Sequence, residues 1–501
     1  MKQLYLFITL AIVMLVGCQP NSRTQKASEE AIAQGFVYLD EDKFMVEGEE
    51  WFPIMLNYRL DWRKFGDTAC VSPAFYYGYD MGWDADNEKD TRKQLEENFA
   101  QISGWGFNAL RLCVDVVNHD SLGYFYAPKA EASYLIKDSC DVFGNLDSVV
   151  NCAKRNGLRI MFLLKAPFEE ELKEYTIALM RHFANNPTVW AYDFMNEPLY
   201  FDPVKNREKM DAVEVAIAWY SMRTLAAPNQ LMTIGFSEPI EVLEWDPSMM
   251  PVDFVQIHTY SPLRVASEMY WYGKYINRPW MIGETGLPCD GDSIPYEWQA
   301  MMMKETYQCA IDNGAIGYGW WEYQDCIIGD FEGMYTGLIN RAGEEKPACK
   351  MVKELKATKH TTKPPVNYYN MVGYNNIKVT GTIVDKRNRP IEGAVIRAWD
   401  ENWAIGQHTF SDSLGHFELY SNDYCRHFKI SAPGYSVMQL HPEIEYTPNI
   451  EGTLPNQRLE YQQIQYQDFL VSDTSILQLK GDKFNQFLQQ GEIGKVELEK
   501  L

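Results

Sequence analysis

Eight short apolar segments recur between residues 52 and 323, and segments of helical periodicity separate most of them. The first runs from Phe52 to Tyr58, and the eight are centred near residues 54, 110, 161, 192, 232, 256, 281 and 318. Buried parallel strands form near-continuous apolar runs because helices cover both faces of their sheet. Eight strand–helix units predict closure into a (β/α)8 TIM barrel. An open doubly wound sheet is the alternative, although no GxGxxG motif follows an early strand.

The fourth apolar segment, Val189 to Phe194, leads directly into Asn196-Glu197-Pro198. Proline lacks a backbone N–H and disfavours the helical region for the residue before it, so the strand must end there. Catalytic groups of barrel enzymes lie at the carboxyl ends of the strands. Glu197 is therefore a candidate catalytic carboxylate, and an ordinary loop charge is the alternative.

The seventh apolar segment also ends in a carboxylate, at Gly283-Glu284, which follows Glu197 by 284 − 197 = 87 residues. Two glutamates on one barrel rim can converge over a shared cleft. Glycoside hydrolysis uses such a pair, one to protonate the leaving oxygen and one to attack or to activate water. His258 and Tyr260 alternate on one face of the preceding strand. The tyrosine hydroxyl could hold the nucleophile ionised, whereas His258 alone would more simply be a core histidine.

Two further sequence features point to the same rim. Arg111 ends an apolar segment and would place a permanent cation inside the barrel, where it needs a carboxylate partner such as Glu284. Trp320-Trp321 ends the last apolar segment, so one ring would point inward as a floor for sugar stacking and the other outward. Both rings could equally be packing residues.

Taken as a set, these residues make the chain resemble clan A glycoside hydrolases, the cellulase- and mannanase-like barrel enzymes, over residues 36–357. The matching positions are Asn196-Glu197-Pro198, His258-Thr259-Tyr260, Gly283-Glu284, Trp321 and Arg111. The resemblance implies a retaining hydrolase that cleaves O-glycosidic, β-linked bonds of a poly- or oligosaccharide by double displacement. It implies that Glu197 is the general acid/base and Glu284 the nucleophile. Asn196 would bond the sugar 2-hydroxyl, and Trp321 would line the −1 subsite.

The chemistry of two carboxylates requires neither a metal nor an organic cofactor. One alternative is a non-catalytic glycan-binding lipoprotein on a decayed barrel, although the presence of both glutamates argues against decay. Another is a structural surface protein whose barrel only displays the following domain. A net charge of −23 would repel phosphate backbones, so nucleic acid is not an expected partner.

A change of composition follows the barrel. Residues 358–375 are rich in Thr, Lys and Pro and are predicted to be a linker. Residues 376–445 alternate with period two between regular turns, which predicts a small β-sandwich. Its segments GTIVD, GAVIRAW, TFSDSLGHFEL and FKISAPGY resemble a carboxypeptidase regulatory-like, transthyretin-like domain. The resemblance implies a spacer or a module that contacts protein or glycan. Residues 446–501 are a Gln-rich extension that we leave unassigned.

The amino terminus has the pattern of a bacterial lipoprotein signal peptide over residues 1–18. Lys2 precedes an apolar run from Leu4 to Val16, and the tetrapeptide LVGC ends at Cys18. The run is too short for a comfortable membrane span. We expect lipidation of Cys18, a tether over residues 19–35, and anchoring in the outer membrane on its periplasmic side or at the cell surface. An ordinary signal peptide or an uncleaved anchor is the alternative.

Overall fold

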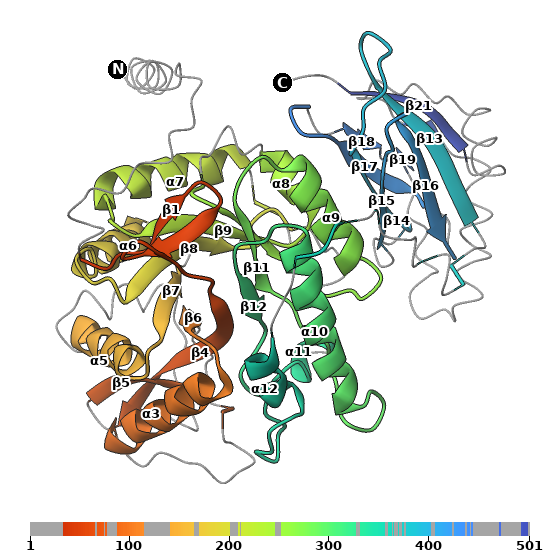
Figure 1. Cartoon of the computed structure of the whole chain (residues 1–501). Coiled ribbons are helices and arrows are strands. Elements are labelled where there is room, and N and C mark those ends of the chain that lie inside the picture. The colour runs from red at the N-terminus through yellow and green to blue at the C-terminus, as the bar shows by residue number, and fades with distance from the viewer. Residues whose placement is uncertain are drawn as a thin grey trace, which may run out of the picture.

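A computed structural model gives the structure of the protein (Figure 1). It describes residues 34–65, 68–74, 76–77, 88–114, 141–164, 170–200, 209–210, 212–245, 252–326, 331–355, 359–362, 364, 369, 373–374, 377–401, 406–422, 425–435, 438–440, 442–443, 470–471 and 492–498. The predicted signal peptide, Cys18 and most of the carboxyl-terminal extension lie outside these residues, so the expected anchor stays a prediction. Among the described residues, no helix is long and apolar enough to cross a membrane.

An eight-stranded parallel sheet forms the centre of the amino-terminal two thirds of the chain. Its strands are β4 (Ile54–Phe65), β6 (Ala109–Val114), β7 (Arg159–Leu163), β8 (Val189–Asn196), β9 (Leu231–Phe236), β10 (Val255–His258), β11 (Trp280–Glu284) and β12 (Tyr318–Trp320). They are ordered β11-β10-β9-β8-β7-β6-β4-β12. The eight predicted strands are thus all present.

The sheet curls until its two end strands meet. Ile316 N donates to Trp280 O at 2.8 Å, and Ile282 N donates to Gly317 O at 3.2 Å. These bonds join β11 to the segment that leads into β12. The result is a curled, barrel-like sheet whose strand ends gather at one rim.

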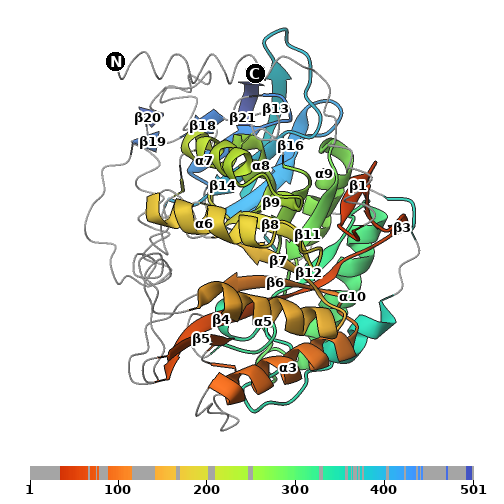
Figure 2. The ribbon, with the colours of Figure 1, turned by 90° about the vertical axis from the view of Figure 1, so that its left-hand side faces the viewer.

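Helices cover the outer face of the sheet, as Figure 2 shows for α3, α5 and α6 beside β4 to β8. The long helices are α3 (Glu88–Trp105), α5 (Val142–Arg155), α6 (Glu170–His182), α7 (Ala212–Ala226), α9 (Val265–Tyr275) and α10 (Tyr296–Asp312). Shorter ones are α8 (Pro239–Trp245), α11 (Phe331–Met334), α12 (Ala348–Met351) and a 3₁₀ turn, Val352–Glu354. Helix α5 shows how the local sequence sets an end, because Asp141 Oδ1 accepts the Gly144 N–H at 2.9 Å as an N-cap.

The first predicted strand is too short. Strand β4 continues past Tyr58 to Phe65 and pairs antiparallel with β5 (Thr68–Pro73). Leu60 and Trp62 are both buried, so the alternation of inward and outward side chains persists beyond the apolar run. The polar residues between them concealed this extension, since the prediction relied on a continuous apolar stretch.

A three-stranded antiparallel sheet lies at the amino ends of the barrel strands. It consists of β1 (Tyr38–Asp40), β2 (Lys43–Val46) and β3 (Glu49–Glu50). Phe44 packs edge-on against Trp190 and Phe254, with ring centroids 5.2 and 5.0 Å apart. Because Trp190 is the second residue of β8 and Phe254 directly precedes β10, this sheet closes the end of the barrel opposite the rim.

The cysteines are mostly core residues. Seven of the eight cysteines among the described residues are buried, which is typical of a small apolar side chain.

Two small sheets follow the barrel. One has the order β16-β13-β21 and the other β15-β14-β17-β18. Their strands are β13 (Ile377–Asp385), β14 (Val395–Trp399), β15 (Gly406–Phe410), β16 (His416–Ser421), β17 (His427–Ser431), β18 (Met438–Leu440) and β21 (Glu492–Leu498). A separate pair, β19 (Pro442–Glu443) and β20 (Leu470–Val471), completes the list. The two small sheets share a core that includes Val379, Ile396 and Phe428. The extension contributes β21, which sequence patterning left unassigned.

Candidate active site

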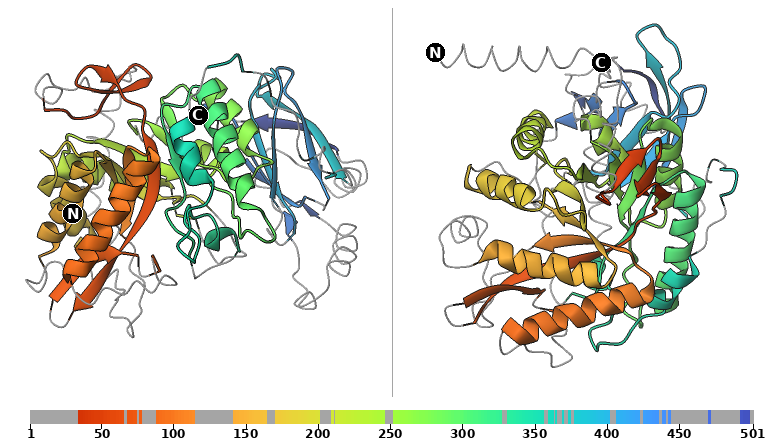
Figure 3. Two further views of the ribbon diagram at one scale, coloured as in Figure 1. Left: turned by 60° about the horizontal axis from the view of Figure 1, so that its bottom comes forward. Right: turned by 60° about the vertical axis from the view of Figure 1, so that its left-hand side comes forward.

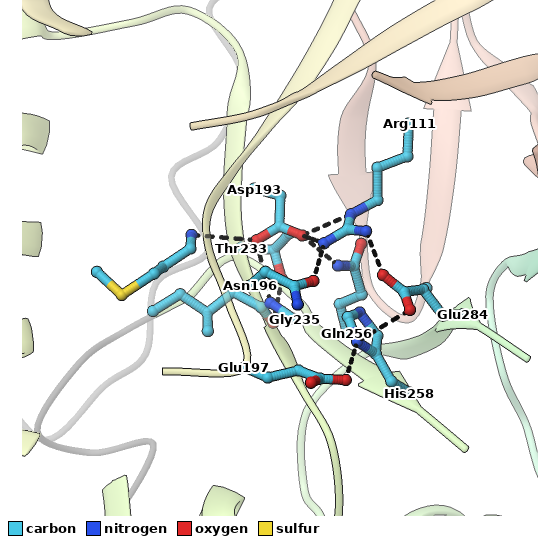
Figure 4. Close-up of polar contacts among 12 residues, drawn as sticks. Arg111, Asp193, Asn196, Glu197, Thr233, Gly235, Gln256, His258 and Glu284 are labelled. Carbon is cyan, nitrogen blue, oxygen red and sulfur yellow. Dashed lines mark hydrogen bonds and ion pairs between the residues drawn. The ribbon is translucent and has the colours of Figure 1, made fainter. Parts of the chain in front are cut away.

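The two predicted glutamates lie at the same rim, at the ends of β8 and β11 (Figure 4). One carboxylate oxygen of Glu197, one of Glu284 and a ring nitrogen of His258 all lie within 4.8 Å of one another. Glu197 has φ of +46°, a left-handed conformation that a Cβ atom disfavours, and its N–H donates to Gly235 O at 2.8 Å. Such backbone strain collects at functional sites, where the surrounding structure holds it in place.

Glu284 is held by one cation and one hydroxyl donor. Nη1 of Arg111 lies 2.5 Å from Oε1, and the Tyr260 hydroxyl donates to Oε2 at 2.5 Å. The side chain of Glu284 is only 6 % exposed. Burial, followed by the charge of Glu284, raises the pKa of Tyr260 well above its usual range, so the phenol remains a donor. The expected Arg111–Glu284 ion pair is therefore present.

Arg111 is a fully buried centre for four neighbours. Nε donates to Asp193 Oδ2 at 2.8 Å, Nη1 donates to Asn57 Oδ1 at 2.9 Å, and Nη2 donates to Asn196 Oδ1 at 2.8 Å. Burial opposes the charge of Arg111, but the carboxylates of Asp193 and Glu284 outweigh it and raise the pKa above its ordinary value. Asn196, expected to contact the sugar, therefore also orients the guanidinium group.

Asp193 is the most important residue that the sequence reasoning missed. Besides Arg111, it accepts hydrogen bonds from Gln256 Nε2 at 2.5 Å and from Gly235 N at 3.0 Å. A charged residue inside an otherwise apolar, buried strand was the available signal, because such a charge requires a partner. Asp193 and Glu284 together surround Arg111 with two negative charges.

His258 lies between the two glutamates. Its Nδ1 is 2.8 Å from Glu197 Oε1 and 3.6 Å from Glu284 Oε2. A Cβ atom on Gly235 would stand 2.6 Å from Nε2 of His258, so only glycine leaves room for the ring. The buried imidazole therefore fixes Glu197 relative to Glu284, which a core histidine without polar partners would not do.

The two tryptophans at the end of β12 differ in exposure. Trp320 is buried, and its Nε1 donates to Thr336 O at 3.3 Å, so it belongs to the packing. Trp321 is half-buried, and its backbone N–H donates to O of Thr285, the residue after Glu284, at 2.9 Å. Of the two tryptophans, Trp321 is therefore the one that keeps accessible surface, and its backbone is bonded to the residue after Glu284.

The Glu197, His258 and Glu284 group offers three atoms that could in principle ligate a cation. Arg111 already neutralises Glu284, and Tyr260 donates to its other oxygen. A divalent ion here would stand beside a buried guanidinium group and would have to displace these contacts. A divalent ion is therefore a poor fit to this donor set.

A further carboxylate, Glu322, follows Trp321 and is buried. The hydroxyls of Tyr76 and Tyr77 both donate to its Oε2 at 2.9 Å. Burial raises the pKa of Glu322 from 4.5 to about 7, against the opposing effect of Arg59. No local sequence pattern indicates this group, because its tyrosine partners lie about 245 residues away.

This shift predicts a pH-dependent stability. A carboxyl whose pKa is raised in the folded state contributes stability that is present below pH 4.5 and is lost as the pH rises through 7. As the pH rises from 5 to 8, the free energy of unfolding should fall less in Glu322→Gln than in the wild type. The difference between the two falls should be up to about 3 kcal/mol. Urea unfolding at both pH values measures the difference. Burial also raises the pKa of Asp325, to about 6, but Asp325 is present in both proteins, so its contribution cancels in the comparison. An equal loss of stability in both proteins would contradict the raised pKa of Glu322.

Comparisons with known proteins add little to this geometry. No family model matches the chain, and no curated protein matches it. Among solved structures, it is similar to a β-glucuronidase from Ruminococcus gnavus in complex with D-glucuronic acid, at 17 % identity, 64 % coverage of this chain, 52 % of that chain and a TM-score of 0.40. It is also similar to a GH5_18 protein from Streptomyces cattleya in complex with GlcNAc, at 13 % identity, 61 % coverage of this chain, 79 % of that chain and a TM-score of 0.42.

A third similar structure is a β-D-glucuronidase from Dictyoglomus thermophilum, with 15 % identity, 64 % coverage of this chain, 53 % of that chain and a TM-score of 0.41. The chain spans about half the length of the glucuronidases that it matches. All these TM-scores are below 0.5, so the likeness assigns neither a family nor an activity. The function of the chain has to be inferred from its own rim residues.

Proposed function

We propose that the protein is a retaining glycoside hydrolase that acts on β-linked O-glycosidic bonds of an oligo- or polysaccharide. The observation that carries the proposal is the approach of a Glu197 oxygen and a Glu284 oxygen to within 4.8 Å. Retaining enzymes hold their carboxyl groups about 5–5.5 Å apart, whereas inverting enzymes need about 6.5–9.5 Å to admit a water molecule. The spacing favours direct attack by one carboxylate on the sugar.

The surroundings of the two carboxylates support different roles. Glu284 lies between Arg111 and Tyr260, which stabilise its negative charge and aim it as a nucleophile. The carboxylate of Glu197 contacts Nδ1 of His258 at 2.8 Å. We therefore infer that Glu284 attacks the anomeric carbon while Glu197 protonates the departing oxygen.

The reaction then proceeds in two displacements. Attack by Glu284 forms a glycosyl ester as the bond to the leaving oxygen breaks, and the proton of Glu197 passes to that oxygen. Water next attacks the anomeric carbon, Glu197 takes its proton, and the ester bond to Glu284 breaks. Asn196 and Trp321 would contact the sugar at the same rim. The cycle restores both carboxyl groups.

The test is the stereochemistry of hydrolysis. A panel of aryl β-glycosides and β-linked polysaccharides would be followed by proton NMR, and we expect the first-formed sugar to keep the β configuration. An α product would contradict the retaining mechanism. Binding to a glycan without turnover on any substrate of the panel would instead favour the non-catalytic glycan-binding alternative.

A further inference from the structure

The carboxyl-terminal sheets lie against one side of the barrel, next to α9 (Figures 1 and 3). Trp271 of α9 is completely buried, its Nε1 donates to Gly393 O at 2.7 Å, and its ring stacks on Phe410 with centroids 5.9 Å apart. At the edge of this contact, Lys274 Nζ lies 2.6 Å from Glu392 Oε1. The contact combines apolar packing with defined polar bonds, which a mere spacer would not need.

A buried ion cluster extends this contact toward the rim. Nε of Arg397, on β14, donates to Glu238 Oε2 at 2.7 Å. Nη1 of Arg264 lies 3.3 Å from the same oxygen. The side chains of Arg397 and Glu238 are only 8 % and 6 % exposed. Because Glu238 comes two residues after β9 ends at Phe236, an arginine of the small sheets holds the carboxyl end of a barrel strand.

A second path reaches the end of β10. Nδ1 of His408, on β15, lies 3.4 Å from Glu268 Oε1, and the other oxygen of Glu268 accepts the Thr259 hydroxyl at 2.5 Å. Thr259 stands between His258 and Tyr260, the residues that contact Glu197 and Glu284. His408 forms no hydrogen bond with Glu268, so on this side the small sheets only pack beside the segment that carries the two side chains positioning the proposed catalytic pair.

Both parts of the chain supply cations to the carboxylates of this cluster. Arg264 lies between Glu238 and Glu268, at 3.3 and 3.8 Å, and Arg397 supplies the second cation. Burial, together with Arg264 and Arg397, lowers the pKa of His408 well below its usual range, so its ring adds no further charge. Without Arg397, the one cation that the described residues would still offer to Glu238 is Arg264, which it shares with Glu268. A buried carboxylate in that position would move toward water and take the end of β9 with it.

We propose that the carboxyl-terminal sheets are part of the catalytic unit, with Arg397 as a positioning residue that holds the rim through Glu238. The inference rests on the proposed hydrolase function. Arg397 touches no reacting atom, so its effect on catalysis is transmitted by the ends of β9 and β10. The small sheets would then help to shape the active site, a role beyond the spacer or contact module that the resemblance implies.

The test compares Arg397→Met with Arg397→Lys, and uses Lys274→Met as the matched control. Lys274 also pairs across the contact but lies at its exposed edge. Turnover of an aryl β-glycoside is measured per active site, titrated by the burst of the aryl product. We expect Arg397→Met to lower kcat about tenfold or more, Arg397→Lys to restore most of it, and Lys274→Met to leave it unchanged.

A double-mutant comparison separates positioning from loss of folded protein. If Arg397 acts through Glu238, adding Arg397→Met to Glu238→Gln should have little further effect on kcat. Should Arg397→Met fail to fold, the charge-balanced Glu238→Gln/Arg397→Gln protein replaces it and should be folded but slow. Wild-type kcat in either protein, additive effects, or no rescue by lysine would overturn the inference. Absence of turnover in the wild type would instead overturn the proposed function.

Discussion

Replacing Glu284 with glutamine is expected to lower kcat by about 10⁴-fold or more, because the amide cannot attack the anomeric carbon. The substitution keeps the size of the side chain and one oxygen for Tyr260. Arg111 would still have Asp193 as an ionic partner at 2.8 Å, so the buried cation is not left alone. We therefore expect a folded protein that is nearly inactive, as judged by steady-state turnover of an aryl β-glycoside.

A matched control is Asp253→Asn. Asp253 is also an ion-paired carboxylate, bound by Arg223 at 2.9 Å, but it precedes β10 at the opposite end of the barrel. Its loss should reduce stability and leave kcat unchanged. In Glu284→Ala, azide can enter the space of the lost side chain and attack directly, so a β-glycoside should yield the α-glycosyl azide. Near-wild-type turnover in Glu284→Gln would remove Glu284 from the proposed role.

The sequence predicted the fold well where a structural element has its own periodic pattern. The eight strands follow from local apolar runs, and the long helices follow from repeats of three and four residues. Helix α8 was missed, because its seven residues are too few to display such a repeat. The continuation of β4 was missed for the opposite reason, since its polar outward residues interrupt the apolar run.

The candidate site was predictable only in part. Glu197 and Glu284 could be found because each directly ends a buried strand. The partners of Arg111 could not be derived in the same way, since Asn57 and Asp193 are distant in sequence and meet it only after the sheet has curled. The ion pair between Arg397 and Glu238 spans 159 residues and joins two separate folding patterns, so no local rule could indicate it.

Asp193 and Arg111 also explain why the rim can hold two carboxylates so close together. Two like charges at this distance repel, and one of them would normally take up a proton. The buried guanidinium group lies on the side of Glu284, whereas Glu197 meets His258. In the mechanism that we propose, Arg111 therefore stabilises the negative charge of Glu284 as the nucleophile, and Glu197 is the carboxylate that exchanges a proton.

Replacing Glu197 with alanine should therefore give a loss that depends on the leaving group. Substrates with a poor leaving group need the proton from Glu197, so their kcat/KM should fall by about 10²–10⁴-fold. The dinitrophenolate of a dinitrophenyl β-glycoside leaves without protonation, so the first displacement of this substrate should remain fast. Its second displacement should be slow, because water then lacks a general base. Stopped-flow measurements should show a rapid burst of dinitrophenolate followed by slow turnover.

Azide distinguishes this variant from the one that lacks Glu284. In Glu197→Ala, the glycosyl ester on Glu284 still forms, and azide needs no general base to attack it. The product should be the β-glycosyl azide, with turnover of the dinitrophenyl substrate restored. If the two alanine variants give glycosyl azides of opposite anomeric configuration, the products identify the face of the sugar that each carboxylate meets. An equal loss for good and poor leaving groups, without azide rescue, would show that Glu197 does not act as the acid/base.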